Sequence, residues 1–497
     1  MKIFNNLQFR EWDAISIHHQ GLRSIELMER AATKLFEWIS GNFENKQLFY
    51  IFCGKGNNGG DGLALARQLI IAGKEVRVFI LETGSGGSPD FFENLHRLHQ
   101  LTPAIVFCQN AESFPFLSED GILVDALFGT GLNKPLDGLA LELIRHLQKH
   151  RGITLAIDLP SGLFSDGPSK PQEVLPATHT LSFQSYKLAL LMDDNGLLVG
   201  NVHILDIGLS QNFEKETDTL FETIEESLIQ MIIRPRNPFG HKGTFGNACL
   251  VAGQHGMMGA AVLAARACLA SGAGKTTLCV PEEESAILPA VIPEALCEFS
   301  GKEKFERTIP FNKFQSVGIG PGIGTDEKTR QALLHSLPGI QAPYLLDADA
   351  LNLLQVADFR SFQHKECVIT PHPLEFDRLF GKSQNVFNRI NLAQNVSMDL
   401  GIYIVLKGHH TCIFTPKGKV YINTNGNDGM AKGGSGDVLT GLITGLLAQG
   451  YPLPEAAILG VFLHGSAGDL ATAKYSRHSM QPSHIIECLA EVWKKLE

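Results

Sequence analysis

The sequence lacks a long apolar run, and it lacks the cysteine pattern of a zinc site or a disulfide framework. No uninterrupted run approaches the roughly 18 residues of a membrane span. The nine cysteines are scattered, odd in number and without a Cys-x-x-Cys pair, which is typical of a reducing compartment. Charged residues at Lys2, Arg10, Glu11 and Asp13 leave no apolar core for a secretory signal. We therefore expect a cytoplasmic protein that does not bind membranes.

Positive charge is also scarce. The chain has 42 Lys and Arg residues against 52 Asp and Glu residues, a net charge of −10, which argues against nucleic acid or anionic membrane as a partner. What the chain does have is length and apolar content. Its 497 residues are 44% hydrophobic, enough to form packed cores in two or three domains.

The most informative stretch runs from Asn425 to Asp437, where five of thirteen residues are glycine. Apolar residues at helical spacing follow from Val438, so the stretch predicts a loop that opens a helix. Backbone N–H groups at a helix N-terminus favour a phosphate group. Asp437 would repel that phosphate unless a metal bridges the two, or unless it takes a proton from an attacking hydroxyl. The alternative is a flexible turn with an N-cap Asp.

The first half alternates strands and helices. One amphipathic helix is expected in the first forty residues, with Ile25 and Ile39 on its apolar face. Strands are expected at 47–53, 76–81, 122–127 and 154–157, and a helix at 63–72. This rhythm predicts a mostly parallel sheet with ligands at the carboxyl ends of its strands.

Three of those strand ends carry reactive residue types: the loop 54–62, the segment 125–131 that begins with Asp125, and the segment 158–162 that begins with Asp158. If they converge, they form one pocket. Asp158 is either a general base there or a helix N-cap. Oxygen atoms of Asn58, Asp125 and Ser161 could hold an alkali or alkaline-earth cation, or they could belong to an ordinary hydrogen-bonded loop core.

A second α/β rhythm begins after a break in the pattern. The acidic run after Phe213, with Pro235 and Pro238, indicates a domain boundary within 212–237. Strands are then expected at 248–252, 276–280, 317–319, 344–346, 368–369 and 402–406, with a helix at 259–271. Each of six strand ends leads into a loop with glycine or a polar residue, so we expect one rim of a second parallel sheet.

Two motifs suggest other functions. The segment 272–276, Gly-Ala-Gly-Lys-Thr, resembles the end of a phosphate-binding Walker loop, but the first glycine would fall on Leu269, and Lys275 opens a strand instead of a helix. A helix C-cap is expected there. Gly54, Gly56 and Gly59 match the dinucleotide fingerprint, with Glu82 near the ribose-binding position, which keeps an NAD-dependent oxidoreductase as an alternative.

Further candidates lie after two strands of the second half. Lys407, Gly408 and Thr411 could bind a nucleotide phosphate near the glycine loop. His372 lies between two prolines and could be a rigid polar contact or part of a solvated turn. His409 and His410 are adjacent, so they are expected to point apart in an extended segment and not to share a metal.

With these motifs in order, nearly the whole chain resembles the bifunctional NAD(P)H-hydrate repair enzymes. The resemblance rests on the segments 27–31, 54–62, 125–131 and 158–162 in the first half. In the second half it rests on 241–243, 320–322, 370–373, 407–411 and 425–437. It implies an α/β chain with a Rossmann-like NAD(P)HX epimerase domain over residues 1–215. It also implies a ribokinase-like, ADP-dependent NAD(P)HX dehydratase domain over residues 225–497.

The resemblance also implies site residues. In the epimerase, the residues expected to contact NADHX or NADPHX are Asn57, Asn58, Gly59, Gly60, Asp61, Gly129, Thr130, Gly131, Leu132, Asn133, Lys134, Pro135 and Asp158. The residues expected to hold K⁺ are Asn58, Asp125 and Ser161. In the dehydratase the hydrate is expected at Ala260, Gly322, His372 and Asp437, and the nucleotide at Lys407, Gly408, His409, His410, Thr411 and Gly436.

The resulting hypothesis is a repair reaction. Asp437 takes the proton of the hydroxyl on C6 of S-NAD(P)HX, the oxygen attacks the terminal phosphate of ADP with Mg²⁺ present, and loss of phosphate restores NAD(P)H and leaves AMP. The epimerase converts the R form. A homo-oligomer is expected. The alternatives are a vitamin or sugar kinase, a conventional oxidoreductase and a non-catalytic nucleotide sensor.

Overall fold

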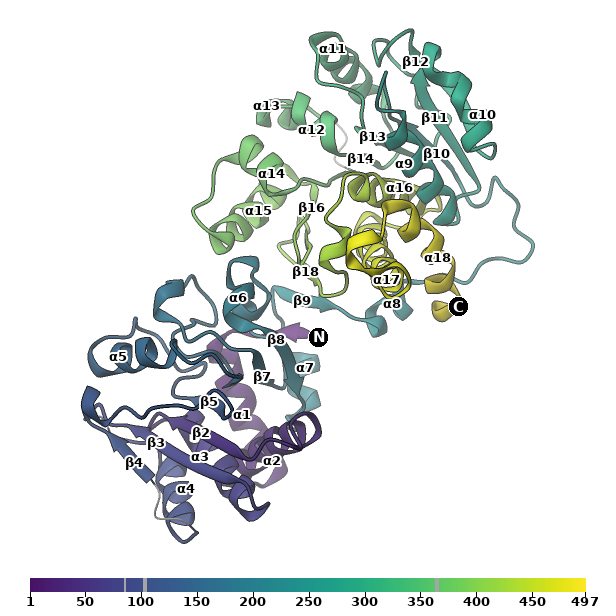
Figure 1. Ribbon diagram of the computed structural model, residues 1–497. Coiled ribbons are helices and arrows are strands. Elements are labelled where there is room, and N and C mark those ends of the chain that lie inside the picture. The colour runs from purple at the N-terminus through teal and green to yellow at the C-terminus, as the bar shows by residue number, and fades with distance from the viewer. Residues whose placement is uncertain (85, 102–104, 363–365) are drawn as a thin grey trace. The chain divides into compact units, whose positions relative to one another are not determined.

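The computed structural model describes residues 1–84, 86–101, 105–362 and 366–497, which form two compact units (Figure 1). The N-terminal unit comprises Lys2–Thr219 with Asn385–Phe387. The C-terminal unit comprises Met1, Leu220–Gln384 and Asn388–Glu497. The division at Thr219 lies between the two expected domain ranges. The acidic stretch around it contains two short helices and a strand, where the sequence pattern indicated only a break.

The N-terminal unit is built on a parallel sheet in the order β4-β3-β2-β5-β6-β7-β8. The elements are β1 (Lys2–Ile3), α1 (Asn6–Gln20), α2 (Ser24–Asn42), β2 (Leu48–Cys53), α3 (Asn57–Ile71), β3 (Glu75–Leu81), α4 (Pro89–His99), β4 (Ile105–Cys108), β5 (Ile122–Ala126), α5 (Gly138–Leu147), β6 (Thr154–Ile157), β7 (His179–Phe183), α6 (Gly196–Val199), β8 (Asn201–Leu205) and α7 (Gln211–Glu216).

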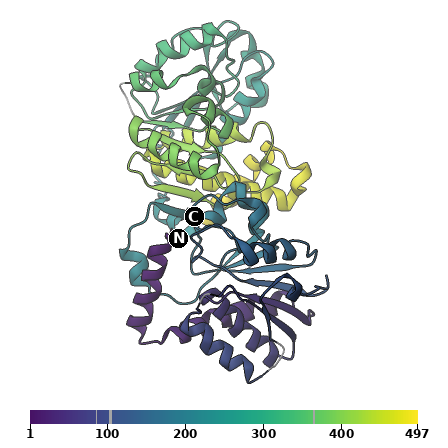
Figure 2. The ribbon, with the colours of Figure 1, turned by 90° about the vertical axis from the view of Figure 1, so that its left-hand side faces the viewer.

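Both faces of this sheet are buried, because successive side chains of a strand point to opposite faces. Phe49 and Ile51 of β2 pack with α2, α3 and α4, whereas Tyr50 and Phe52 of the same strand pack with α5. Figure 1 labels α4 and α5 on opposite sides of the sheet, and Figure 2 shows the purple and blue helices from the side. The sheet is therefore the middle layer of a three-layer α/β unit, as the sequence predicts.

Two boundaries in this unit differ from expectation. The single helix expected in the first forty residues is two helices, α1 and α2, because Gly21 adopts a left-handed φ of 64° and ends the first. The helix expected from Leu63 begins earlier, at Asn57. The glycine-asparagine loop therefore forms the first turns of α3, and its backbone N–H groups face the strand ends.

The C-terminal unit has strands in the order β9-β18-β17-β16-β15-β14-β13-β10-β11-β12. The elements are β9 (Phe221–Ile224), α8 (Glu226–Ile232), β10 (Asn247–Val251), α9 (Met258–Ala270), β11 (Lys275–Pro281), α10 (Leu288–Val291), β12 (Leu296–Gly301), β13 (Ser316–Ile319), α11 (Glu327–Ser336), β14 (Tyr344–Leu346), α12 (Ala348–Leu353), α13 (Val356–Ser361), β15 (Cys367–Ile369), α14 (Pro373–Phe380), α15 (Val386–Leu400), β16 (Tyr403–Leu406), β17 (Cys412–Phe414), β18 (Val420–Asn423), α16 (Ser435–Ala448), α17 (Leu453–Ser479) and α18 (Pro482–Leu496).

The central strands of this unit are parallel, and β17 pairs antiparallel with both β16 and β18. Helix α16 is buried along most of its length. It packs with α17, α18 and the strands β14 to β17 in one apolar cluster. Burial of α16 fixes its N-terminus, with Asp437 in the first turn, against the carboxyl ends of the sheet.

Helix α17 has the length and apolar composition of a membrane-spanning helix. Of its most apolar 18-residue window, 61% is buried inside the unit. It packs against α16 and α18, as the core helix of a folded domain does.

Candidate active sites

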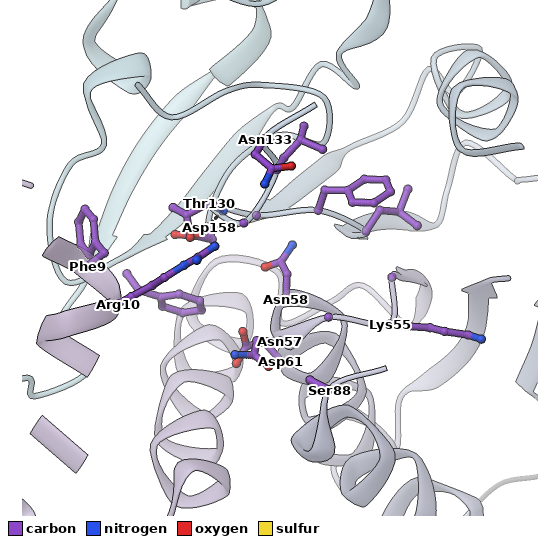
Figure 3. Close-up of a pocket in the computed structure, with 18 of the residues that line it drawn as sticks. Phe9, Arg10, Lys55, Asn57, Asn58, Asp61, Ser88, Thr130, Asn133 and Asp158 are labelled. Carbon is purple, nitrogen blue, oxygen red and sulfur yellow. Dashed lines mark hydrogen bonds between the residues drawn. The ribbon is translucent and has the colours of Figure 1, made fainter. Parts of the chain in front are cut away.

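In the N-terminal unit, a cavity of about 830 Å³ opens at the carboxyl ends of the strands (Figure 3). The residues from Gly129 to Pro135 line it, as do Asn57, Asn58, Asp61 and Asp158. Gly59 and Gly60 do not line the cavity. A Cβ atom at Gly59 would lie 1.7 Å from the carbonyl oxygen of Gly54, so the absence of a side chain there lets the turn before α3 close.

Asp158 is the most constrained residue of this cavity. It follows β6 and has φ of 66°, a left-handed conformation that costs about 1–3 kcal/mol for a residue other than glycine. One carboxylate oxygen accepts a hydrogen bond from the Thr130 backbone N–H at 3.1 Å. The other lies 2.7 Å from the Nζ of Lys187. The side chain is therefore fixed at the cavity wall.

Lys187 is buried, with only 2% of its side chain exposed. Its Nζ donates to the hydroxyl of Ser182 at 3.0 Å and to the carbonyl of Phe183 at 2.9 Å, both in β7. The ammonium also lies 4.6 Å from the centre of the Phe9 ring of α1. A buried charge that is fully hydrogen-bonded and paired holds its partner firmly, so Lys187 keeps the side chain of Asp158 in place.

Asp61 has a different environment from Asp158 in the same cavity. Within the described part of the chain, its carboxyl group accepts no hydrogen bond and forms no ion pair. Desolvation, followed by the nearby carboxylates of Asp158, Asp13 and Asp90, raises the pKa of Asp61 well above its usual range. The two carboxyl groups therefore differ in their partners: Asp158 has an ammonium group and a backbone N–H beside it, and Asp61 has neither within the described residues.

Asp125 and Ser161 lie behind the cavity lining. The carboxylate of Asp125 accepts from the Ser161 hydroxyl at 2.6 Å, from the Ser161 N–H at 2.8 Å and from the Leu127 N–H at 3.2 Å. Burial raises the pKa of Asp125 to about 6 despite these hydrogen bonds. The Ser161 hydroxyl in turn accepts from the Phe128 N–H at 2.9 Å.

The Asn58 amide reaches the same loop from α3. A Cβ atom at Gly129 would lie 3.3 Å from its Oδ1. Among the described residues, neither polar atom of this buried amide has a hydrogen-bond partner. Unsatisfied buried polar atoms are rare and call for a ligand or an ion. The structure thus brings together around the loop 127–129 all three residues predicted to hold a cation.

The lining residues that sequence reasoning missed include Phe9, Arg10 and Asp13 of α1, and Lys187. None belongs to a glycine-rich or strand-end motif. The Glu82 carboxylate, considered above as a ribose ligand, forms an ion pair with Lys55 of the glycine loop.

In the C-terminal unit, the rim of the sheet collects charged side chains beside the first turn of α16. Lys407, which follows β16, donates to Asp347 at 2.9 Å and lies 3.9 Å from Glu375. Asp347 also accepts from the hydroxyl of Thr440 in α16 at 2.7 Å. Burial lowers the pKa of Lys407, but Asp347 and Glu375 outweigh it and the net pKa is raised, so this side chain is a fixed cation.

Asp437 lies within this charged group. Burial, followed by the charge of Asp347, raises its pKa to about 6, while Lys407 lowers it in part. A Cβ atom at the neighbouring Gly436 would lie 3.5 Å from the Nζ of Lys407. The first backbone N–H groups of a helix have no intrahelical partner, so the first turn of α16 offers amides, a cation and a carboxyl group together.

Two further predicted positions meet nearby. A Cβ atom at Gly322 would lie 3.3 Å from the Cβ of Ala260 in α9. The preceding Gly320 approaches the backbone of Asp347 so closely that its Cβ would lie 1.8 Å from that carbonyl oxygen. The loop after β13 is thereby joined to the loop after β14, which carries Asp347 and Asp349.

His372 is held rigidly and does not lie in a loose turn. It caps α14: its Nδ1 accepts from the N–H groups of Leu374 and Glu375, both at 3.2 Å. The carboxylate of Glu375 accepts from the His372 N–H at 2.8 Å. Glu375 also lies 3.9 Å from the Nζ of Lys407, so a hydrogen bond and an ion pair link His372 to the charged group beside Asp437.

One expectation at this rim was wrong. His409 and His410 do not point apart, because the segment bends and is not extended. Their ring centres are 4.5 Å apart in an edge-to-face arrangement. Thr411 donates weakly to the Gly408 carbonyl at 3.4 Å, which closes the same bend after β16.

The residues that the sequence reasoning did not assign to this site are Asp347, Asp349, Glu375 and Thr440. Asp347 follows β14 directly, so its strand-end position was a usable signal. Ala348 between the two aspartates has φ of 46°. Thr440 and Glu375 lie within helices, and only the packing of the fold brings them to the rim.

The discounted Walker-like segment is structural. Gly272, with φ of 99°, follows the end of α9, and Lys275 opens β11. This confirms the prediction of a helix end and a strand at this segment.

Comparison with known proteins matches both units. The model of the family described as NAD(P)H-hydrate dehydratase matches residues 248–491. The family described as YjeF-related protein N-terminus matches residues 24–189. The bifunctional NAD(P)H-hydrate repair enzyme Nnr of Moorella thermoacetica is 34% identical over 519 residues, covering 100% of this chain and 97% of that protein.

Solved structures resemble the C-terminal unit. A ribokinase-like superfamily protein from Enterococcus faecalis has a TM-score of 0.50 and 30% identity, covering 56% of this chain and 98% of that one. An ADP/ATP-dependent NAD(P)H-hydrate dehydratase from Bacillus subtilis, co-crystallised with ATP and Mg²⁺, is 33% identical with a TM-score of 0.49, covering 55% of this chain and 98% of that one.

Proposed function

The chain belongs to the bifunctional NAD(P)H-hydrate repair enzymes, and from this premise we propose which residues carry each of its two activities. The N-terminal unit is the epimerase and the C-terminal unit the dehydratase. The observation that supports the assignment most directly is the first turn of α16, where Asp437, with its raised pKa, lies among the amides, Lys407 and Asp347.

In the dehydratase, Asp437 takes the proton from the hydroxyl on C6 of S-NAD(P)HX. The hydroxyl oxygen attacks the terminal phosphate of ADP, and the α16 amides and Lys407 offset the growing negative charge. The phosphorylated oxygen then leaves as the ring nitrogen donates its electrons, which gives NAD(P)H, AMP and phosphate. Ala260, Gly322 and His372 contact the hydrate. The nucleotide contacts Gly436 and the segment 407–411.

The residues at this rim fit a nucleotide with Mg²⁺. Within the described residues no group of three or more His, Cys, Asp or Glu side chains is arranged to hold a metal ion. Mg²⁺ usually keeps water and phosphate ligands and takes only one or two carboxylates from the protein. Asp349, whose charge adds to the raised pKa of Asp437, is the carboxylate that would hold the ion, which neutralises phosphate charge.

In the epimerase, NADHX or NADPHX occupies the cavity lined by Asn57, Asn58, Asp61, Asp158 and the segment 129–135, with Gly59 and Gly60 shaping the turn behind it. Asp158 acts as the base, held by Lys187 and the Thr130 N–H. The cavity size suits part of a dinucleotide, since ligand pockets of ~300–1,000 Å³ enclose drug-sized molecules.

We also propose a K⁺ ion at Asn58, Asp125 and Ser161. The fit rests on the unpartnered amide of Asn58 and on the buried carboxylate of Asp125. Within the described residues, Asp125 has no cationic side chain as a partner. K⁺ takes oxygen ligands of this kind. The ion would tie α3 to the loops after β5 and β6 and keep the cavity wall in shape.

We also propose where the enzyme is located and that it forms a homo-oligomer. None of the nine cysteines, all of which lie in the described part of the chain, forms a disulfide bond, and this pattern supports the proposed reducing, cytoplasmic location. A homo-oligomer remains part of the proposal, and size-exclusion chromatography with light scattering on the full chain tests it directly.

The decisive experiment incubates hydrated NADH with ADP or ATP and follows recovery of NADH. Replacing Asp437 with Ala should abolish dehydration, a loss on the order of 10²- to 10⁴-fold for a general base, and should leave epimerisation intact. Near-wild-type dehydration by the Asp437→Ala variant would remove Asp437 from this role. A stable phosphorylated product instead of inorganic phosphate would indicate a kinase.

A further inference from the structure

The epimerase cavity holds two carboxyl groups whose surroundings differ, and the epimerase assignment above leaves one of them without a role in the chemistry. Asp158 has a cation and a backbone N–H as partners. Asp61, on α3, accepts no hydrogen bond within the described residues and has other carboxyl groups as neighbours. Figure 3 shows the two side chains coming from different walls of the cavity, Asp158 from the β6 end and Asp61 from the helix.

One route to inversion at a carbon that bears a hydroxyl group replaces that hydroxyl with water, and this route needs proton transfers on both faces of the carbon. One face must give a proton to the departing oxygen, and the other must take a proton from the water that replaces it. A carboxyl group paired with a cation is suited to take a proton, and one without a cation or a hydrogen-bond donor beside it is suited to give one. Asp158 is suited to the base and Asp61 to the acid.

Building on the epimerase function proposed above, we propose that Asp61 is the general acid and Asp158 the general base of NAD(P)HX epimerisation. Asp61 gives its proton to the C6 hydroxyl. The C6–O bond breaks while the lone pair of ring nitrogen N1 forms a C=N⁺ bond, and one water molecule leaves. A water molecule then adds to the opposite face of C6 and loses its proton to Asp158.

The step balances without an oxidant, a reductant or a nucleotide. One proton passes from Asp61 to the departing water and one from the incoming water to Asp158, and exchange through cavity water restores both groups. In the reverse direction the two carboxyl groups exchange roles. The water that adds comes from solvent, so the hydroxyl oxygen on C6 is replaced once for each inversion.

Asp61→Asn tests the acid role because it keeps the shape of the side chain and removes the proton. We expect the turnover number for interconversion of separated R- and S-NADHX to fall on the order of 10²-fold or more, with KM changed less than threefold. The matched control is Asp90→Asn, which also removes a carboxylate near Asp61 but lies outside the cavity lining. It should retain turnover within about twofold.

Asp13→Asn tests the rival assignment, since Asp13 also lines the cavity and its charge lies near Asp61. If this variant loses turnover while Asp61→Asn keeps it, Asp13 is the acid and the inference is wrong. If Asp61→Asn changes only KM, Asp61 contributes to binding and not to proton transfer, and the inference is also wrong. Folding of each variant is checked by its thermal transition.

Labelled water gives an independent readout on the wild-type enzyme. In H₂¹⁸O, each inverted molecule should carry ¹⁸O at C6, and inversion without label would contradict the proposed route. Different results would contradict the epimerase function and the role of Asp61. If the wild-type chain does not interconvert R- and S-NADHX, the epimerase function fails. If it does and Asp61→Asn is equally fast, only the role of Asp61 fails.

Discussion

At the scale of single residues, the chemistry depends on carboxyl groups whose surroundings set their proton affinity. Asp437 is buried beside Asp347, which raises its pKa to about 6, and Lys407 limits the increase. Asp158 is paired with a buried ammonium. Asp158 directly follows β6, and Asp437 lies in the first turn of α16, so in both cases the backbone and not a long side chain determines where the carboxyl group points.

The raised pKa of Asp437 predicts the pH dependence of dehydration. A general base works only when it is deprotonated, so kcat/KM for S-NADHX should fall tenfold per pH unit below about pH 6 and level off above it. Initial rates from pH 5 to 8 measure this profile. The residual rate of the Asp437→Asn variant should not fall in this way at low pH. If it still falls tenfold per pH unit below about pH 6, another group takes the proton.

Lys187→Met removes the ammonium while keeping the apolar stem. Epimerase turnover should drop on the order of 10²-fold, because Asp158 loses the cation that holds its side chain at the cavity wall. Leaving that charge buried and unpaired should also cost about 3–5 kcal/mol of stability, measured by chemical denaturation. The double variant Lys187→Met with Asp158→Asn should regain stability and stay inactive. If the double variant is as unstable as the single one, the ion pair is not the cause.

At the scale of elements, the first turn of α16 combines a conformational and a chemical requirement. Gly434 precedes the helix with φ of 97°, and a Cβ atom there would lie 2.7 Å from the Cδ1 of Leu263. Gly436 has an ordinary helical conformation, and a Cβ atom there meets nothing closer than 3.5 Å. Glycine is therefore required for folding at Gly434 and for access at Gly436.

Alanine at these two positions should separate folding from binding. Gly434→Ala should lose roughly 1–2 kcal/mol because a left-handed φ is unfavourable for a residue with a Cβ atom. Gly436→Ala should keep its thermal transition but raise KM for the nucleotide at least fivefold, since the new methyl group occupies the space beside the Lys407 ammonium. Thermal melts with dehydration kinetics test both. Equal effects on stability would contradict the distinction.

The K⁺ site predicts a stability effect confined to the N-terminal unit. An ion that binds only the folded state stabilises it by about 2.7 kcal/mol at 100 times its dissociation constant. We expect K⁺ to raise the melting temperature more at pH 7.5 than at pH 5, because Asp125, with a pKa of about 6, must be ionised to bind it. Asp125→Asn should abolish this effect. Choline at equal ionic strength is the control.

Element boundaries were predictable where burial leaves a continuous apolar run. The parallel strands around β2, β10 and β13 begin and end within about a residue of expectation, since strands buried on both faces have such sequences. The strands β17 and β18 were missed although β14 and β15 are as short and were expected, because β17 and β18 pair antiparallel and lie outside the alternation of strands and helices that guided the prediction. Asp437 and Asp158 were found because glycine-rich loops mark them, whereas Lys187 and Asp13 reach the cavity through packing of distant segments.

At the scale of the whole molecule, the chain carries two sites in two compact units, each at the strand ends of its own sheet. Because the dehydratase is expected to accept only S-NAD(P)HX, complete repair of a mixture of epimers requires both sites. Variants in one unit should leave the activity of the other unchanged.

This independence is measurable with a mixture of R- and S-NADHX and excess ADP. The wild-type chain should convert all of the hydrate to NADH. Lys187→Met should convert the S fraction at the normal rate and then slow to the rate of spontaneous epimerisation. The time course of absorbance at the nicotinamide band reports both phases. A slower first phase in this variant would show that the sites are coupled.

The left-handed backbone at Asp158 also limits what can replace it. Among residues other than glycine, aspartate and asparagine tolerate such a φ best. A related protein that has lost Asp158 during evolution should therefore carry Asn or Gly at this position and still fold. Surveys of related genomes can use this substitution to recognise pseudoenzymes that keep the binding cavity without its turnover.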